Sequence, residues 1–100
     1  MTNDLSTPIL AINHTPLAIK VYPNPTANAF FVNLMGRAQS KATIEVMNEI
    51  GAIVYEQRLE EIKDKPVKID LWNQADGLYL IRIIVDGELP ILKKMVKTSR

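Results

Sequence analysis

The sequence contains no cysteine and only one histidine, His14. Without cysteine the chain can form no disulfide bond, no thiolate metal site and no cysteine nucleophile. A single histidine also excludes a zinc or iron site built from several imidazoles of this chain. His14 lies in a polar stretch with no triad-like motif near it, so we interpret it as an ordinary exposed side chain. These absences weigh against an enzyme, and we expect neither a metal nor another cofactor.

Neither sign of charge dominates: 12 Lys and Arg residues oppose 11 Asp and Glu residues, which leaves a net charge of +1. Such a balance gives no overall attraction to nucleic acid or to an anionic membrane. The first apolar run, residues 8–12, is far shorter than the roughly 18 to 20 residues of a membrane span. No Lys or Arg precedes it, unlike in a secretory signal peptide. We therefore expect no nucleic-acid partner and no direct membrane insertion.

The remaining composition is that of one small globular domain preceded by a linker. The chain has 100 residues, and residues 1–17 are polar and contain Pro8 and Pro16, which is typical of extended connecting segments. From residue 18 to residue 100, short apolar runs are separated by turn residues at intervals of about ten, as in all-β sandwiches and barrels. The predicted strands are residues 18–22, 29–34, 41–47, 53–59, 66–71, 77–85 and 89–97.

Two-residue alternation supports several of these strands. Between residues 41 and 47, Ala42, Ile44 and Val46 fall on one side, while Thr43 and Glu45 fall on the other. This period indicates one buried and one solvated face. Turn signals lie between the strands, and Asp86-Gly87 is a hairpin signal before the last one.

Residues 55–64 allow two interpretations. Tyr55, Leu59 and Ile62 recur at helical spacing, and the segment is rich in good helix formers. The β-rich neighbours on both sides favour a strand that ends in a charged loop. We adopt the strand and keep the helix as the alternative.

Charged clusters are the first candidates for chemistry. Glu60, Glu61 and Asp64 lie among lysines, as on a solvated surface, rather than as a general acid and base pair. Asp70, Asp76 and Asp86 are too scattered for a regular calcium loop.

The basic C-terminal end is a weak candidate for nucleic-acid binding. Its cations are Lys93, Lys94, Lys97 and Arg100, but no aromatic residue follows Tyr79 to stack on bases. Lysines that protect an edge strand against aggregation explain the same pattern. Trp72 stands alone after a predicted strand, where a tryptophan can anchor a sugar or a partner but more often covers the end of a core.

The segment Pro23-Asn24-Pro25 follows the first predicted strand directly. Each proline fixes its own φ and pushes the preceding residue into an extended conformation. The segment therefore predicts a stiff corner, in which the Asn24 side chain can bond to nearby backbone.

Taken in order, these features resemble the C-terminal sorting domain, type A, of the type IX secretion system of the Bacteroidota. The resemblance rests on five pieces with matching spacing: Tyr22-Pro23-Asn24-Pro25-Thr26, the I-x-V-x-N-x-x-G pattern that ends at Gly51, Asp70-Leu71, Gly77-x-Tyr79, and Lys93-Lys94-Met95-Val96-Lys97 at the end. It covers residues 18–100 and implies an immunoglobulin-like β-sandwich of about seven antiparallel strands. It also implies a sorting signal that is not an enzyme and carries no cofactor.

The resemblance further implies a route and partners. Such domains end a larger cargo that enters the periplasm through its own signal peptide, which here would precede Met1. The outer-membrane translocon and its barrel-shaped shuttle protein then recognise the domain. A sortase-like peptidase removes it at the cell surface, here within the linker between Thr2 and Lys20. The cargo becomes surface-bound or secreted.

We divide the family residues into two groups. The residues that we expect to contact the translocon are Pro23, Asn24, Pro25, Lys93, Lys94, Met95, Val96 and Lys97. The residues that we expect to be mainly structural are Tyr22, Gly51, Asp70, Leu71, Gly77 and Tyr79. If the last strand lies at a sheet edge, its free backbone groups would pair with a receptor strand or form a strand-paired dimer.

Two other functions remain as alternatives. One is an immunoglobulin-like or fibronectin-like adhesive or spacer module, which shares the fold but has another role. The other is a carbohydrate-binding module, which needs several exposed aromatic residues on one face. Phe30 and Phe31 are adjacent and so point to opposite faces, while Trp72 stands alone.

Overall fold

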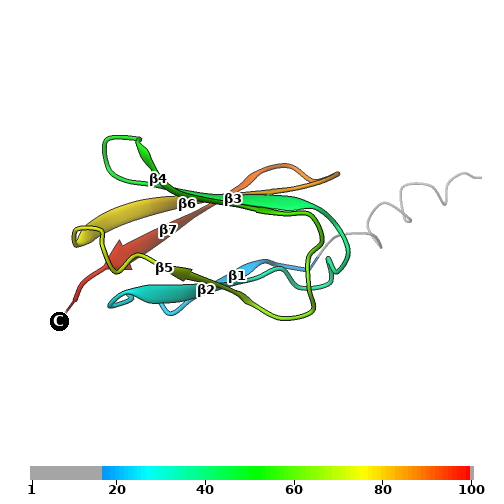
Figure 1. Ribbon diagram of the computed structural model, residues 1–100, viewed down its shortest axis with the longest axis horizontal. Coiled ribbons are helices and arrows are strands. Elements are labelled where there is room, and N and C mark those ends of the chain that lie inside the picture. The colour runs from blue at the N-terminus through cyan, green and yellow to red at the C-terminus, as the bar shows by residue number, and fades with distance from the viewer. Residues whose placement is uncertain (1–16, 100) are drawn as a thin grey trace, which may run out of the picture.

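The structure is a computed structural model that describes residues 17–99. It contains seven strands (Figure 1). Their bounds are β1 Lys20–Tyr22, β2 Ala29–Asn33, β3 Ala42–Met47, β4 Ile53–Leu59, β5 Val67–Asp70, β6 Gly77–Val85 and β7 Ile91–Lys97. All seven strands predicted from the sequence are present, because period-two alternation and turn residues are local signals that the tertiary structure does not override here.

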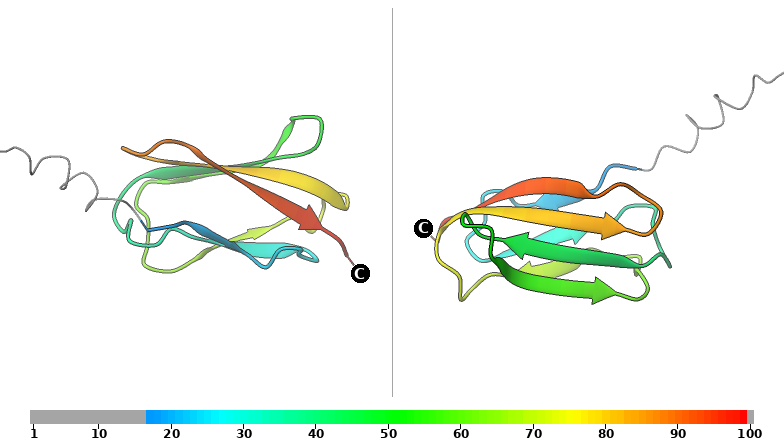
Figure 2. Two further views of the ribbon diagram at one scale, coloured as in Figure 1. Left: turned by 180° about the vertical axis from the view of Figure 1, so that it is seen from behind. Right: turned by 90° about the horizontal axis from the view of Figure 1, so that it is seen from above.

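The strands form two sheets that pack face to face (Figure 2). The smaller sheet has the order β1-β2-β5 and the larger one the order β4-β3-β6-β7, and all strand pairs are antiparallel. This is the immunoglobulin arrangement, except that the fourth strand lies in the larger sheet beside the third. The predicted all-β sandwich is confirmed.

The core fills the space between the sheets with mostly aliphatic side chains and two buried aromatic rings, Phe30 and Tyr79. Alternation along β6 buries Tyr79, Ile81 and Ile83, while the residues between them face outward. The predicted inward set of β3 is also buried. The expectation that Glu45 is solvated is wrong, since it is only 9% exposed and accepts a 2.7 Å hydrogen bond from Arg82 Nε of the neighbouring strand.

The helical alternative for residues 55–64 is wrong. Strand β4 continues to Leu59, and the next residues form a non-helical loop. Ile62 is buried because its backbone N–H donates to Ser40 O and its carbonyl accepts from Gln39 N, both at 2.8 Å. These bonds bring Ile62 into the core at the end of the sandwich, so its spacing from Leu59 reflects a turn rather than a helix.

The described chain begins and ends at opposite ends of the sandwich (Figure 1). Beside the C-terminal end lie the β3–β4 turn, the start of β6 and the end of β7, as their pairing requires: Met47 lies opposite Leu80, and Leu78 opposite Val96. Within residues 17–99, no helix is long and apolar enough to cross a membrane.

Candidate functional site

The terminal strand β7 is the edge strand of the larger sheet, and its alternation decides which predicted contact residues are accessible. Met95 faces the core and is fully buried, and Lys97 is only 4% exposed. Lys94 and Val96 point outward and are exposed, and Lys93 is half-buried. On the folded domain the side chains of Lys94 and Val96 are therefore accessible, and those of Met95 and Lys97 are not.

The corner after β1 lies against the outer edge of β7. Asn24 Nδ2 donates to Lys94 O at 3.0 Å, and Val96 N donates to Asn24 Oδ1 at 3.0 Å. The primary amide of asparagine carries the same donor and acceptor as a peptide group. Pro23 and Pro25 have no backbone N–H, so the Asn24 side chain supplies the donor that this segment's prolines lack.

Thr26 extends this pairing toward the C-terminus. Its N–H donates to Val96 O and its carbonyl accepts from Thr98 N, both at 2.9 Å, and together they form a parallel bridge. The Thr26 hydroxyl donates to Ala29 O at the start of β2. The outward backbone groups in the C-terminal half of β7 are therefore already paired within the domain. A receptor strand or a second copy could pair there only after residues 24–26 move away.

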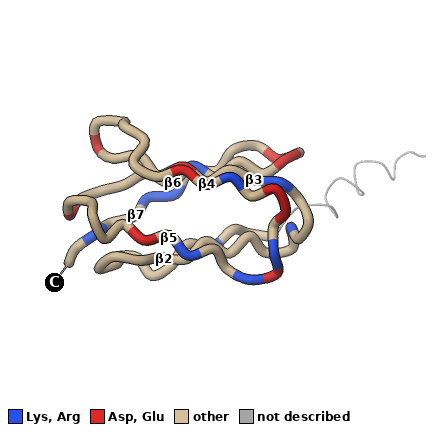
Figure 3. The backbone as a smooth tube through the Cα atoms, viewed as in Figure 1, with Lys and Arg blue, Asp and Glu red and all other residues tan. Residues whose placement is uncertain are grey.

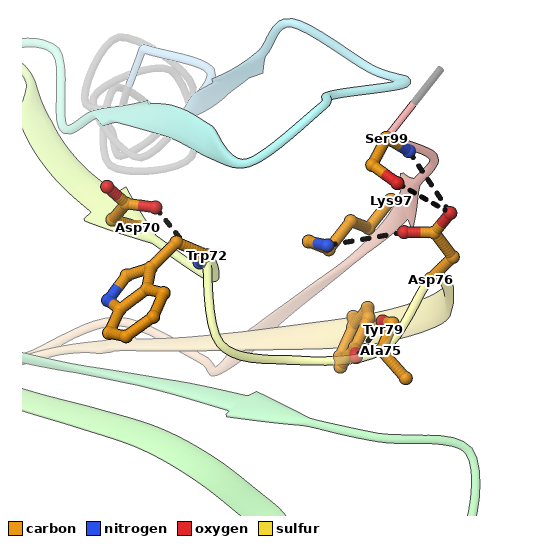
Figure 4. Close-up of polar contacts among 7 residues, drawn as sticks. All are labelled: Asp70, Trp72, Ala75, Asp76, Tyr79, Lys97 and Ser99. Atoms are coloured by element: carbon orange, nitrogen blue, oxygen red, sulfur yellow. Dashed lines mark hydrogen bonds and ion pairs between the residues drawn. The ribbon is translucent and has the colours of Figure 1, made fainter.

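A second contact holds the end of the chain (Figure 4). The Asp76 carboxylate accepts bonds from Ser99 N and Ser99 Oγ at 3.1 Å and pairs with Lys97 Nζ at 3.2 Å. The pKa of Asp76 lies below its usual range, mainly because the carboxylate accepts a hydrogen bond from Ser99 N–H and, as the next largest cause, one from the Lys97 ammonium. This carboxylate explains how Lys97 can be buried, since the lysine stem packs inward while its charge finds a partner.

The family residues around the β5–β6 connection have structural contacts. The Tyr79 hydroxyl donates to Ala75 O four residues earlier, as in the tyrosine corner of immunoglobulin-like sandwiches (Figure 4). Asp70 Oδ1 accepts from Trp72 N at 3.0 Å, and Leu71 is buried. Trp72 is 71% exposed, so the expectation that it covers the core end is wrong; Leu71 takes that place because the chain turns directly after it.

The glycine of the I-x-V-x-N-x-x-G pattern closes the β3–β4 turn. Gly51 has a φ of +87°, a conformation that disfavours side chains. Asn48 Oδ1 accepts from Ile50 N at 3.2 Å and from Ala52 N at 2.9 Å. Gly77 begins β6 beside this turn, where an added Cβ would lie 3.3 Å from Glu49 Oε1.

Of the remaining candidates, Tyr22 lies near the terminal strand, since it lines a hollow together with Lys93 and Lys94 of β7. Tyr22 stacks on Phe31 of β2 with ring centroids 5.8 Å apart. Glu60 and Glu61 are exposed and pair with lysines at 4.0 and 3.4 Å. Acidic and basic residues are interspersed over both sheets (Figure 3), and no cluster of metal-ligating side chains occurs in residues 17–99. His14 and most of the expected cleavage region lie outside the described residues.

Comparisons with known proteins point to one family. A family model described as the secretion system C-terminal sorting domain matches residues 20–98, from the start of β1 to just beyond β7. The chain is 27% identical over 95 residues to a protein described as ulvan lyase NLR42 from Nonlabens ulvanivorans. This match covers 93% of the chain and only 17% of that relative.

Proposed function

The chain belongs to the family of type IX secretion-system C-terminal sorting domains, and we propose that it directs a cargo protein across the outer membrane of a Bacteroidota cell. A domain of this family implies a secreted or cell-surface cargo and contact with the secretion machinery. The finer steps proposed here are transit through the periplasm, recognition by the translocon and its shuttle protein, and removal by a sortase-like peptidase between Thr2 and Lys20.

The observation that carries the proposal is the family match over residues 20–98, which spans the whole sandwich. The proposed role needs no catalysis by this domain, only a stable surface that a receptor reads. The lyase activity in the relative's name is a property of that protein, and we propose none for this chain.

The test is an export assay in a Bacteroidota host with a working translocon. A fluorescent reporter carries a signal peptide at its N-terminus and residues 1–100 at its C-terminus, and the control reporter lacks residues 1–100. We expect the tagged reporter outside the cells and the untagged reporter in the periplasm. Equal retention of both reporters would contradict the sorting function.

Truncating β7 would be a poor control, because it removes the buried side chain of Met95 from the core. A better one appends a polar Gly-Ser extension after Arg100, which leaves the core intact. A terminal sorting signal should lose export, whereas an adhesive or spacer module would tolerate the extension. Mass spectrometry of the exported reporter tests cleavage: an end between residues 2 and 20 supports it, and a retained domain contradicts it.

A further inference from the structure

The outward face of the larger sheet carries an unusual group of apolar side chains. We define the outer apolar patch as Met47, Ile53, Leu78, Leu80, Leu92 and Val96. Strand register brings five of them together, since Met47 lies opposite both Ile53 and Leu80, and Leu78 lies opposite Val96, while Leu92 lies further along β7, opposite Arg82. Side chains directly opposite in antiparallel strands are in contact range. The outer face of an antiparallel sheet is usually polar, so this patch requires an explanation.

Three residues of the patch line a hollow of about 400 Å³ beside the β3–β4 turn. Met47, Leu78 and Leu80 form its apolar lining, Gly51 and Glu49 border it from the turn, and Lys94 borders it from β7. Lys94 forms no ion pair with any residue in the described part of the chain. The hollow therefore combines an apolar floor with the Lys94 cation on the β7 side and the Glu49 carboxylate on the turn side, and neither forms an ion pair within residues 17–99.

Most of the patch lies on one end of the sandwich. Apart from Leu92, near the start of β7, its residues lie on strand ends that meet beside the C-terminal end, away from the end where the described chain begins (Figure 1). A protein body that precedes residue 17 is attached at the opposite end. The patch is thus presented in the direction of the chain terminus.

The exposed side chains of the terminal strand belong to this face, whereas Lys93, which points the other way, is half-buried. Asn24 and Thr26 occupy the outer backbone edge in the C-terminal half of β7, and Met95 faces the core. The outward side chains are Leu92, Lys94 and Val96. A partner that recognises the exposed side chains of β7 approaches the outer face, where Leu80 and Leu78 are the neighbours of Lys94 and Val96.

We propose that the outer apolar patch is the surface by which the secretion machinery docks on this domain, a proposal that rests on the sorting function above. The partner is a protein segment that places an aliphatic or aromatic side chain in the hollow and a carboxylate beside Lys94. Burial of the apolar side chain supplies affinity, and the charge pair supplies orientation and association rate.

The test uses the export assay with residues 1–100 as the tag. Leu78→Glu places a charge in the hollow, and Lys94→Glu reverses the cation. The matched controls are Leu89→Glu, at the 86% exposed leucine of the β6–β7 turn, and Lys68→Glu, on the outer face of the smaller sheet. Thermal unfolding followed by circular dichroism verifies that each variant is folded.

We expect both patch variants to lower export about tenfold or more, the effect of losing an interface hot-spot residue, and both controls to export like the wild type. Wild-type export by either folded patch variant would overturn the docking surface and leave the sorting function intact. Failure of the wild-type tag itself would overturn the sorting function. If light scattering shows a wild-type dimer that Leu78→Glu dissociates without loss of export, the patch joins two copies and the proposal is wrong.

Discussion

The contact between Asn24 and β7 gives the sharpest prediction of stability. Replacing Asn24 by alanine removes the acceptor for Val96 N and the donor to Lys94 O, both at 3.0 Å. A neutral hydrogen bond contributes about 0.5 to 1.5 kcal/mol net. Because Asn24 is exposed, water replaces part of each bond in the variant. We therefore expect a loss of about 1 to 2 kcal/mol in the free energy of unfolding.

For a domain of this size, each kcal/mol lowers the unfolding temperature by about 4 to 8 °C. The Asn24→Ala domain should therefore unfold about 4 to 16 °C below the wild type. Far-UV circular dichroism is the suitable probe, because Trp72 is 71% exposed in the folded state and its fluorescence changes little on unfolding. The matched control is Asn28→Ala, an exposed asparagine whose side chain forms no hydrogen bond with the described residues.

Hydrogen exchange provides a local measurement of the same contact. In the Asn24→Ala domain the Val96 amide should exchange faster relative to the amides of central strand β3, because its acceptor is gone. Suppose that Asn24→Ala unfolds at the same temperature as Asn28→Ala and that Val96 stays protected. The claim that Asn24 holds the terminal strand is then refuted.

Three further predictions follow from single contacts. The lowered pKa of Asp76 means that its ionised form stabilises the folded domain above the unfolded-state pKa of about 3.9, and that this contribution disappears as pH falls through the lower folded-state value. Urea unfolding of the wild type and Asp76→Ala should therefore differ above about pH 4 and converge in stronger acid, and a constant difference would contradict this account. Tyr79→Phe keeps the ring in the core but loses the hydrogen bond to Ala75 O, so urea unfolding should show a free energy of unfolding about 1 kcal/mol lower. An unchanged urea midpoint would contradict this contribution. Gly51→Ala should lower the free energy of unfolding by about 1 kcal/mol, because alanine is strained at the positive φ of this position. An added Cβ would meet no atom within 4 Å, so a steric clash does not contribute, and an unchanged stability would contradict the strain.

The sequence predicts the strands well because their signals are local. Alternation along β3 and β6, and turn residues such as Gly51, identify elements from their immediate neighbours. The orientation of β7 is harder to predict. Its outward residues include Leu92 and Val96, whereas the inward ones place Met95 between two lysines. Hydrophobic pattern alone therefore favours neither face of this strand.

What decides the orientation of β7 is a partner 21 positions away. Asp76 satisfies the ammonium of Lys97, and this allows the lysine stem to be buried. If the register of β6 and β7 is counted back from the Asp86-Gly87 turn, residue 76 comes close to the end of the chain. That register depends on the length of the turn, which the sequence alone does not determine. The contact of Asn24 with β7 joins residues 70 and 72 positions apart and leaves no local pattern at all.

The two most separated pieces of the family pattern thus act as one structural unit. The corner at Asn24 occupies the edge of β7, and in doing so leaves the outer face as the accessible side of the last strand. The outer apolar patch needs Met47 from β3, Leu78 from β6 and Val96 from β7 at once, so it exists only when these strands of the larger sheet have assembled. A receptor that reads this patch would respond to the assembled sheet and not to the terminal peptide alone. A free peptide of residues 91–100 should accordingly fail to compete with the intact tag for export, whereas effective competition would show that the linear sequence is sufficient.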